Sequence, residues 1–212
     1  EGYARIAGKP AVVMLTTGPG SINAFNGVYG AFTDSIPMIV ISGQVKRETC
    51  LSFHELPQLR QLGDQEGPTV AMASSICKSA TLVRDAVAVQ TALPAAYALA
   101  ISGRPGPVWL DIPLDVQSSK EALTFPELAA TEKRQAPNLD AACLEIIQRL
   151  KRAHRPLILG GTGIRLAGAT DLLLQLVEEN GIPLATAWTH DLIASAHPPS
   201  PGRPHQWRPR SR

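Results

Sequence analysis

A glycine-rich turn between two patterned stretches is the first place in this sequence where chemistry could occur. Residues 11–15 read as a buried strand, which leads into Thr17-Gly18-Pro19-Gly20 and then a helical pattern over residues 21–32. Glycines at such a turn let backbone N–H groups approach a ligand closely, and the start of the helix is partly positive. Asn23, in the first helical turn, adds a side-chain donor and acceptor. Alone, this pattern leaves ligand binding and a purely structural turn both open.

A second glycine turn follows another apolar run. Residues 156–159 read as a strand, Gly160-Gly161-Thr162-Gly163 follow, and residues 167–180 predict a helix that ends at Gly181. With a further strand beginning at residue 182, this order makes one turn of a doubly wound fold. The turn taken by itself is an ordinary strand-to-helix connection.

Two polar pairs are weaker candidates for chemistry. His54 and Glu55 could form a catalytic pair, but neighbouring residues in a polar loop are more often solvated. Asp34 and Ser35 suggest a nucleophile, yet no matching histidine is evident, so a role in a turn is expected.

The candidate residues must be positioned by a parallel sheet. Residues 37–42 and 107–112 are further continuous apolar runs, and residues 85–101 between them have a helical pattern. Continuous apolar strands that alternate with helices indicate a parallel sheet covered on both faces, which is the α/β class. Residues 46–68 are polar and lack a period, so they read as a loop. Farther on, Asn138 or Asp140 is expected to cap a helix that runs through residue 150.

The composition is that of an ordinary globular protein. Hydrophobic residues are 44% of the chain, charged residues are 18%, and the net charge of +2 is too small to imply a nucleic-acid partner. No apolar run is long enough to predict a membrane span, and no signal peptide is recognised. The sparse, odd set of cysteines shows no metal-ligand spacing and favours a reducing cytoplasm; it consists of Cys50, Cys77 and Cys143.

The chain is expected to hold two partial domains. Residues 1–117 form the first and 139–197 the second, with a polar linker at 118–138. Residues 198–212 are rich in proline and arginine without apolar periodicity, which predicts a disordered, non-native tail; a basic nucleic-acid tail is the alternative. Because the chain opens on Glu1 within a helix-like stretch, we expect the first domain to begin upstream of it. We expect the second domain to lack its end.

Several short motifs occur in a particular order along the chain. They are Gly2-Tyr3-Ala4-Arg5, Gly8-Lys9-Pro10, Thr17-Gly18-Pro19-Gly20 with Asn23, Asp34-Ser35-Ile36-Pro37, Gly43-Gln44-Val45, Gly103-Arg104-Pro105-Gly106-Pro107-Val108, Asp111-Ile112-Pro113, Asp115-Val116-Gln117, and Arg155-Pro156 with Leu159-Gly160-Gly161-Thr162-Gly163. Together they resemble the pyrimidine-binding domain and the start of the central domain of thiamine-diphosphate-dependent enzymes. Acetolactate synthase is the nearest well-known member, and the likeness runs over residues 1–197.

This resemblance implies roles for residues of the first domain. Pro19 and Asn23 would lie beside the aminopyrimidine ring of thiamine diphosphate, and Gly18 and Gly20 would shape that turn. Gln65 would lie near the reacting centre and is the catalytic residue that the resemblance assigns to this chain.

The resemblance also implies a flavin site. Arg104 matches an arginine that contacts FAD in flavin-containing relatives, and Gly160, Gly161 and Gly163 match a turn that lies against FAD. Some relatives keep this domain without FAD, so flavin binding is left open. The alternatives are a surface salt bridge for Arg104 and a plain turn for the glycines.

Two functional parts of the family fall outside these residues. The catalytic glutamate that hydrogen-bonds the pyrimidine lies upstream of Gly2-Tyr3-Ala4-Arg5, before Glu1, and no Gly-Asp-Gly…Asn motif for Mg²⁺ and the diphosphate occurs. We therefore expect no metal ligands here and no activity from this chain alone. The implied parent enzyme decarboxylates a small 2-oxo acid and transfers the resulting aldehyde unit, as in branched-chain amino acid biosynthesis. It would do so as a homodimer or homotetramer with active sites between subunits.

Two positions depart from the acetolactate synthase pattern. Leu114 stands where those enzymes usually carry lysine, and Asp64 stands where phenylalanine commonly precedes the glutamine. The loop from residue 50 to residue 62 is also longer. These departures favour, as an alternative, another thiamine-diphosphate-dependent decarboxylase or carbon–carbon lyase. A second alternative is a non-catalytic fragment that binds a nucleotide or a partner subunit.

Overall fold

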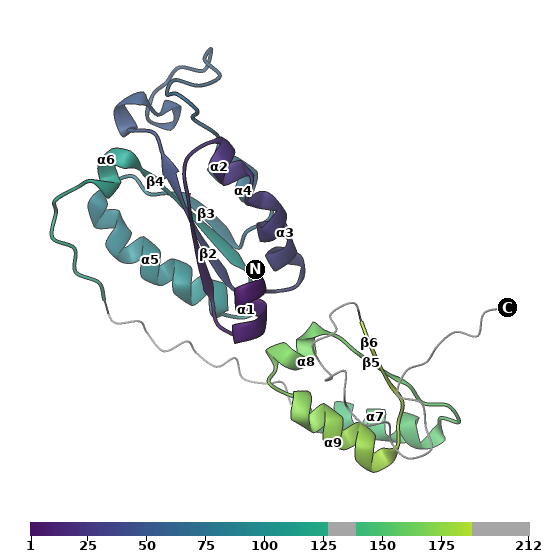
Figure 1. Ribbon diagram of the computed structural model, residues 1–212. Coiled ribbons are helices and arrows are strands. Elements are labelled where there is room, and N and C mark those ends of the chain that lie inside the picture. The colour runs from purple at the N-terminus through teal and green to yellow at the C-terminus, as the bar shows by residue number, and fades with distance from the viewer. Residues whose placement is uncertain (127–138, 188–212) are drawn as a thin grey trace. The chain divides into compact units, whose positions relative to one another are not determined.

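The computed structural model describes residues 1–126 and 139–187. They fall into two compact units, Glu1–Arg134 and Gln135–Arg212, and each unit has its own parallel sheet (Figure 1). None of the helices in the described ranges combines the length and hydrophobicity that crossing a bilayer requires.

The first unit is built on a four-stranded parallel sheet. Its strands are β1 (Ala11–Leu15), β2 (Met38–Gln44), β3 (Ser79–Leu82) and β4 (Pro107–Pro113), in the order β1-β2-β4-β3. Helix α5 (Ala86–Ile101) covers one face, and α2 (Pro19–Ile22), α3 (Phe25–Thr33) and α4 (Thr69–Ala73) cover the other (Figure 1). Short helices α1 (Gly2–Ala7) and α6 (Leu114–Gln117) flank the sheet. The predicted α/β class with a parallel sheet is confirmed.

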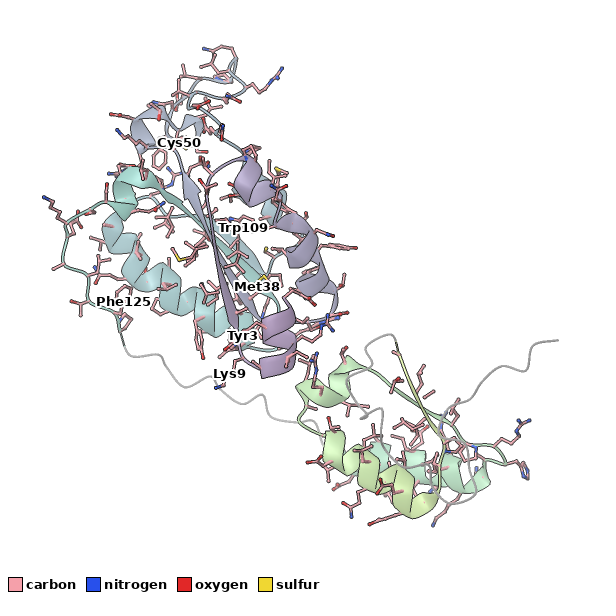
Figure 2. The ribbon with its side chains drawn as sticks, viewed as in Figure 1. Tyr3, Lys9, Met38, Cys50, Trp109 and Phe125 are labelled. Carbon is pink, nitrogen blue, oxygen red and sulfur yellow. The ribbon has the colours of Figure 1, made fainter. Side chains whose placement is uncertain are left out.

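Both faces of the central strands are apolar because alternate residues enter two separate cores. Val40 and Trp109 pack on the side of α3, whereas Ile39 and Leu110 pack on the side of α5. Trp109 is fully buried, with its ring stacked on that of Phe25 at a centroid distance of 5.1 Å. Figure 2 shows Trp109 and Met38 in the interior between the sheet and the helices. This two-sided burial is why these strands have no polar alternation in the sequence.

Some local features of the first unit differ from the sequence prediction, and one predicted feature is confirmed. The helix predicted over residues 21–32 is two helices, because at Ala24 the backbone N–H donates to Ser21 O, three residues back, and the regular ladder is interrupted. Strand β3 and helix α4 were not predicted, since both are short and β3 is a half-buried edge strand with little apolar pattern. The predicted loop after β2 is confirmed and contains two 3₁₀ turns, η1 (Arg47–Thr49) and η2 (Leu51–Phe53).

The second unit pairs two parallel strands, β5 (Ile158–Gly160) and β6 (Leu184–Thr186). Its helices are α7 (Asp140–Arg152), α8 (Thr162–Leu166) and α9 (Thr170–Asn180). Gly181 ends α9 with a left-handed φ of 58°, as predicted. The predicted cap of α7 is wrong for Asp140, which is the first helical residue; Leu139 is the capping position and makes no side-chain cap.

Some predictions fall on residues outside the described ranges. They concern Asn138 as a cap, part of the linker over 127–138, and the tail at 198–212. The domain boundaries at 117, 138 and 197 likewise stay predictions.

Candidate functional site

The carboxyl ends of β1, β2 and β4 bring three connecting segments together. The glycine turn follows β1, the loop of residues 45–68 follows β2, and Asp111 lies near the end of β4. Ligands of open parallel sheets bind beyond the carboxyl ends of the strands, where the connections diverge. This edge is therefore where the fold itself predicts a site.

The glycine turn has a backbone that other residues would not adopt. Gly18 has φ +56° and ψ −120°, and a Cβ built on it would lie 2.1 Å from the backbone O of Gln65. A Cβ on Gly20 would lie 2.4 Å from Cγ2 of Thr16. Glycine is therefore required at position 18, where a side chain would meet a backbone atom, whereas a Cβ at position 20 would force the Thr16 side chain to move. Pro19 and Asn23 remain exposed at the surface of the turn.

Gln65 reaches this turn from the loop after β2. Its own φ is +57°, an uncommon value for a residue with a side chain, and the residue is exposed. Its backbone O contacts Gly18, and a Cβ on Gly67 would lie 3.4 Å from the Gly18 Cα. The structure therefore brings the predicted Gln65 and the predicted glycine turn into direct contact, although they are far apart in the sequence.

Glu66 holds the loop in the conformation that presents Gln65. Its carboxylate accepts backbone N–H groups from Leu51 at 2.6 Å, Leu62 at 2.9 Å and Gly63 at 3.2 Å. Burial alone would raise the pKa of the Glu66 carboxyl, but these donors outweigh it and hold that pKa below its usual value.

A buried polar network lies beneath the two segments. Asp111 is 1% exposed, and its carboxylate accepts hydrogen bonds from Ser42 Oγ at 2.5 Å, Gln44 Nε2 at 2.9 Å and Thr69 Oγ1 at 3.0 Å. Trp109 Nε1 donates to Ser42 Oγ at 2.7 Å. Burial raises the pKa of Asp111, and the three donors act in the opposite direction by stabilising the carboxylate.

The sequence prediction missed Gln44, Glu66 and Asp111 as organisers of the site. One signal was present for Asp111, since a carboxylate inside an otherwise continuous apolar strand must be buried and needs donors. For Gln44 the sequence offered only its place in the motif Gly43-Gln44-Val45, and for Glu66 only its place beside Gln65; neither indicates the hydrogen-bond partners of these residues.

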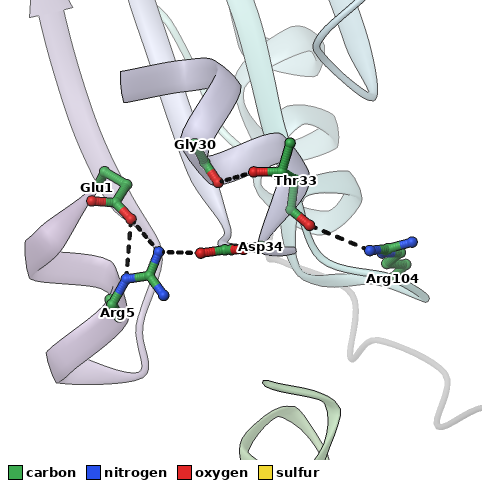
Figure 3. A network of polar contacts seen from close by, with 6 residues as sticks. All are labelled: Glu1, Arg5, Gly30, Thr33, Asp34 and Arg104. Atoms are coloured by element: carbon green, nitrogen blue, oxygen red, sulfur yellow. Dashed lines mark hydrogen bonds and ion pairs between the residues drawn. The ribbon is translucent and has the colours of Figure 1, made fainter. Parts of the chain in front are cut away.

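Arg104 lies at the opposite end of the sheet from Gly18 and Gln65, because it precedes β4 and contacts the segment before β2. Its Nε donates to Ser35 Oγ at 2.6 Å, and Nη2 lies 3.4 Å from the carbonyl O of Thr33. Figure 3 shows Arg104 beside the end of α3, close to the ion pair of Arg5 with Asp34 at 2.5 Å. Arg104 thus anchors the end of α3 in this structure.

The second predicted glycine turn belongs to the second unit. Gly160 ends β5, Gly161 is the capping position of α8, and Gly163 lies within α8, so the turn is shorter than predicted. A Cβ at Gly161 or Gly163 would meet no atom within 4 Å, so these positions face open space. A ligand could lie in that space against the turn, but the space does not indicate which ligand.

The remaining candidates show no catalytic arrangement. His54 is exposed, with Nε2 3.0 Å from the carbonyl O of Glu48. Burial raises the pKa of the Cys50 thiol to about 11 and that of Cys77 to about 12, so neither is a ready nucleophile. In residues 1–126 and 139–187, no three His, Cys, Asp or Glu side chains gather in a way that could hold a metal ion.

Two family models match this chain. Residues 1–67 match the N-terminal TPP binding domain of thiamine pyrophosphate enzymes, and residues 144–206 match their central domain. The first match contains the glycine turn, Gln44 and Gln65.

Curated relatives agree with these matches. The chain is 32% identical to the acetolactate synthase large subunit of Lactococcus lactis over 192 residues, which is 88% of this chain and 31% of that protein. It is 33% identical to the chloroplastic acetolactate synthase of Arabidopsis thaliana over 195 residues, which is 88% of this chain and 27% of that protein. For the large subunit of Haemophilus influenzae, identity is 31% over 192 residues, 88% of this chain and 32% of that protein.

The chain thus spans about a third or less of the length of these relatives. Within that span, each unit contains one stretch that matches a family model. Both matches are consistent with the observed glycine turn, the parallel sheet and the order of the motifs along the chain. The chain belongs to the thiamine pyrophosphate enzymes, and it is similar to the acetolactate synthases among them.

Proposed function

We propose that this chain supplies the pyrimidine-binding part of a thiamine-diphosphate-dependent carboligase of the acetolactate synthase type. The observation that carries this proposal is the contact between Gly18 and Gln65 at the carboxyl end of a parallel sheet. It joins the turn assigned to the pyrimidine with the glutamine assigned to the reacting centre. The proposed substrate is a small 2-oxo acid, and the proposed process is branched-chain amino acid biosynthesis.

The residues of the turn fit an aminopyrimidine ring. Gly18 and Gly20 allow the backbone to approach closely, exposed Pro19 offers an apolar face, and exposed Asn23 offers a donor and an acceptor. When bound, thiamine diphosphate supplies the carbanion stabilisation that decarboxylation and aldehyde transfer need. The part proposed for this chain is to orient the ring and to place the Gln65 side chain at the edge of the site.

Binding of Mg²⁺ and of the diphosphate is not assigned to residues of this chain. Mg²⁺ and the diphosphate need hard oxygen ligands, and the described residues contain no such cluster. Arg104, Gly160, Gly161 and Gly163 are the proposed FAD contacts in a flavin-containing member. The proposed enzyme is a homodimer or homotetramer in the cytoplasm.

Titration of the isotopically labelled chain with thiamine diphosphate and Mg²⁺ tests the proposal. We expect amide chemical shifts to change at Gly18, Gly20, Asn23 and Gln65, with Gln175 of helix α9 in the second unit as an unaffected control. Changes confined to other residues, or no change at millimolar cofactor, would contradict pyrimidine binding. In a pyruvate carboligation assay, we expect no turnover from the 212 residues alone.

A second candidate is another decarboxylase or carbon–carbon lyase of the same family. It is favoured by Leu114, which is 52% exposed at the start of α6, and by exposed Asp64 beside Gln65. Both lie at the carboxyl edge of the sheet, where they would alter the surroundings of a substrate. Product analysis with pyruvate, in any longer protein that contains this chain, separates the two: acetolactate supports the first candidate, and acetaldehyde or cleavage products support the second.

A further inference from the structure

Gln44 lies between the two segments that form the candidate site. It is the last residue of β2, is 6% exposed, and makes four hydrogen bonds through its side-chain amide. Its Nε2 donates to the carbonyl O of Gly67 at 3.1 Å and to Asp111 Oδ2 at 2.9 Å. Its Oε1 accepts from Thr17 Oγ1 at 3.0 Å and from its neighbour Val45 N at 2.9 Å.

These four bonds use the full capacity of the amide. A glutamine side chain has two N–H donors and one carbonyl oxygen with two acceptor sites, and each of them has a partner here. One end of the amide holds Thr17, next to Gly18 in the glycine turn. The other end holds Gly67, two residues after Gln65. A single buried side chain therefore connects both segments.

Asp111 determines which way the amide points. Its Oδ2 accepts from Nε2 of Gln44, so the reversed amide would place two oxygens against each other and leave Val45 N facing another donor. Trp109 Nε1 donates to Ser42 Oγ, which directs the Ser42 hydroxyl proton to Asp111 and keeps the carboxylate an acceptor. The orientation of Gln44 thus follows from a directional chain of donors that begins in the core.

We propose that Gln44 is a positioning residue that sets the spacing between the glycine turn and the loop segment of residues 65–67, which contains Gln65. It acts through Thr17 on one segment and through Gly67 on the other. The role rests on the proposed function, since that function gives the two segments their parts in pyrimidine and substrate binding. The spacing itself can be measured without any cofactor.

Two substitutions separate the two ends of the amide. Gln44→Ala removes all four hydrogen bonds. Gln44→Glu keeps an oxygen for Thr17 and Val45 but replaces the donor to Gly67 and Asp111 by a second oxygen. Gln175→Ala is the control, because Gln175 Nε2 also donates a side-chain hydrogen bond, to Glu179 Oε1 at 2.8 Å, but both residues belong to helix α9 of the second unit.

Residue-resolved amide hydrogen exchange in the full 212-residue chain gives the readout. Gly20 reports on the turn, Glu66 on the loop and Val40 on the core. With Gln44→Ala we expect exchange at Gly20 and Glu66 to accelerate at least about tenfold relative to Val40, as the loss of one or two hydrogen bonds implies. With Gln44→Glu we expect that acceleration at Glu66 but not at Gly20. The nuclear Overhauser contact between Gly18 and Gln65 should weaken in both variants and persist in Gln175→Ala.

A purely structural role would give a different pattern. If either variant accelerates Gly20, Glu66 and Val40 equally, or if Gln44→Glu releases both segments alike, the positioning role is wrong. The cofactor titration is separate from this test: if thiamine diphosphate perturbs neither segment of the unsubstituted chain, the proposed function fails while the exchange pattern still decides the role of Gln44.

Discussion

Gly18 shows how strongly one backbone position controls the candidate site. Alanine there would have to adopt φ +56° and place its Cβ 2.1 Å from Gln65 O. We expect Gly18→Ala to destabilise the fold by at least about 2 kcal/mol, because the left-handed backbone and the clash both oppose it. Gly27→Ala is the control: Gly27 lies in α3 with open space around it, and alanine there should stabilise by roughly 0.5–1 kcal/mol. Urea denaturation measures the free energy of unfolding of both variants, and an equal change in the two would contradict the steric explanation.

Asp111 is the second residue at which the effect of a substitution on stability can be predicted. Asn at this position would replace one acceptor oxygen with an N–H₂ group that faces the donors of Gln44 and Thr69. We expect Asp111→Asn to cost about 2–4 kcal/mol, since buried donors would lose their acceptor. Asp115→Asn is the matched control, because the half-exposed pair of Asp115 with Arg47 is worth at most about 1 kcal/mol. Thermal unfolding of the two variants gives the comparison, and a smaller loss for Asp111 than for Asp115 would show that the buried network is not needed.

At the scale of elements, the loop after β2 depends on an ionised Glu66. The folded-state pKa of this carboxyl is lowered, so its stabilising effect is present above the unfolded value of about 4.3 and is lost as pH falls through the folded value. We expect amide exchange at Leu62 and Gly63, corrected for intrinsic rates and compared with Val40, to accelerate below about pH 4. Glu66→Gln should loosen the same amides at every pH with a flat profile. A flat profile in the unsubstituted chain would instead rule out this role.

Helix α5 begins with a side-chain cap from Asp85, a residue that the sequence pattern included in the helix. Asp85 accepts the backbone N–H of Ala88 at 2.7 Å, which satisfies one of the unpaired donors of the first turn. We expect Asp85→Ala to lower the free energy of unfolding by about 1 kcal/mol, and Asp85→Ser to lose only part of this. Denaturation midpoints of the two variants decide it, and an unchanged midpoint in Asp85→Ala would mean that the cap contributes little.

At the scale of the whole molecule, one edge of the first sheet carries exposed apolar side chains. Strand β1 is an edge strand, and Val12 and Met14 on it are 60% and 78% exposed. Exposed apolar edge strands favour association between copies, and a charge on the edge opposes it. We expect Met14→Lys to shift self-association of the chain to higher concentration in sedimentation velocity. Leu172→Lys, at a residue 69% exposed on α9 in the second unit, is the control for the added charge; an equal shift would show that net charge, and not the edge, is responsible.

The amino-acid sequence by itself determined the apolar strands, the long helix α5, the glycine turn and the family. These features follow from local composition and from the order of motifs along the chain, and they require no knowledge of distant contacts. The break between α2 and α3, edge strand β3 and the true cap of α7 could not be predicted, because short elements carry too little periodicity.

Only the tertiary structure decided how the site is assembled. The contact of Gln65 with Gly18, the four hydrogen bonds of Gln44 and the donors around Asp111 join segments that the sequence separates widely. The sequence shows that a glutamine or an aspartate lies at the end of a strand. It does not show which groups will be the hydrogen-bond partners of that side chain. Those partners depend on which strands are neighbours in the parallel sheet, and the order β1-β2-β4-β3 is set by packing on both faces at once.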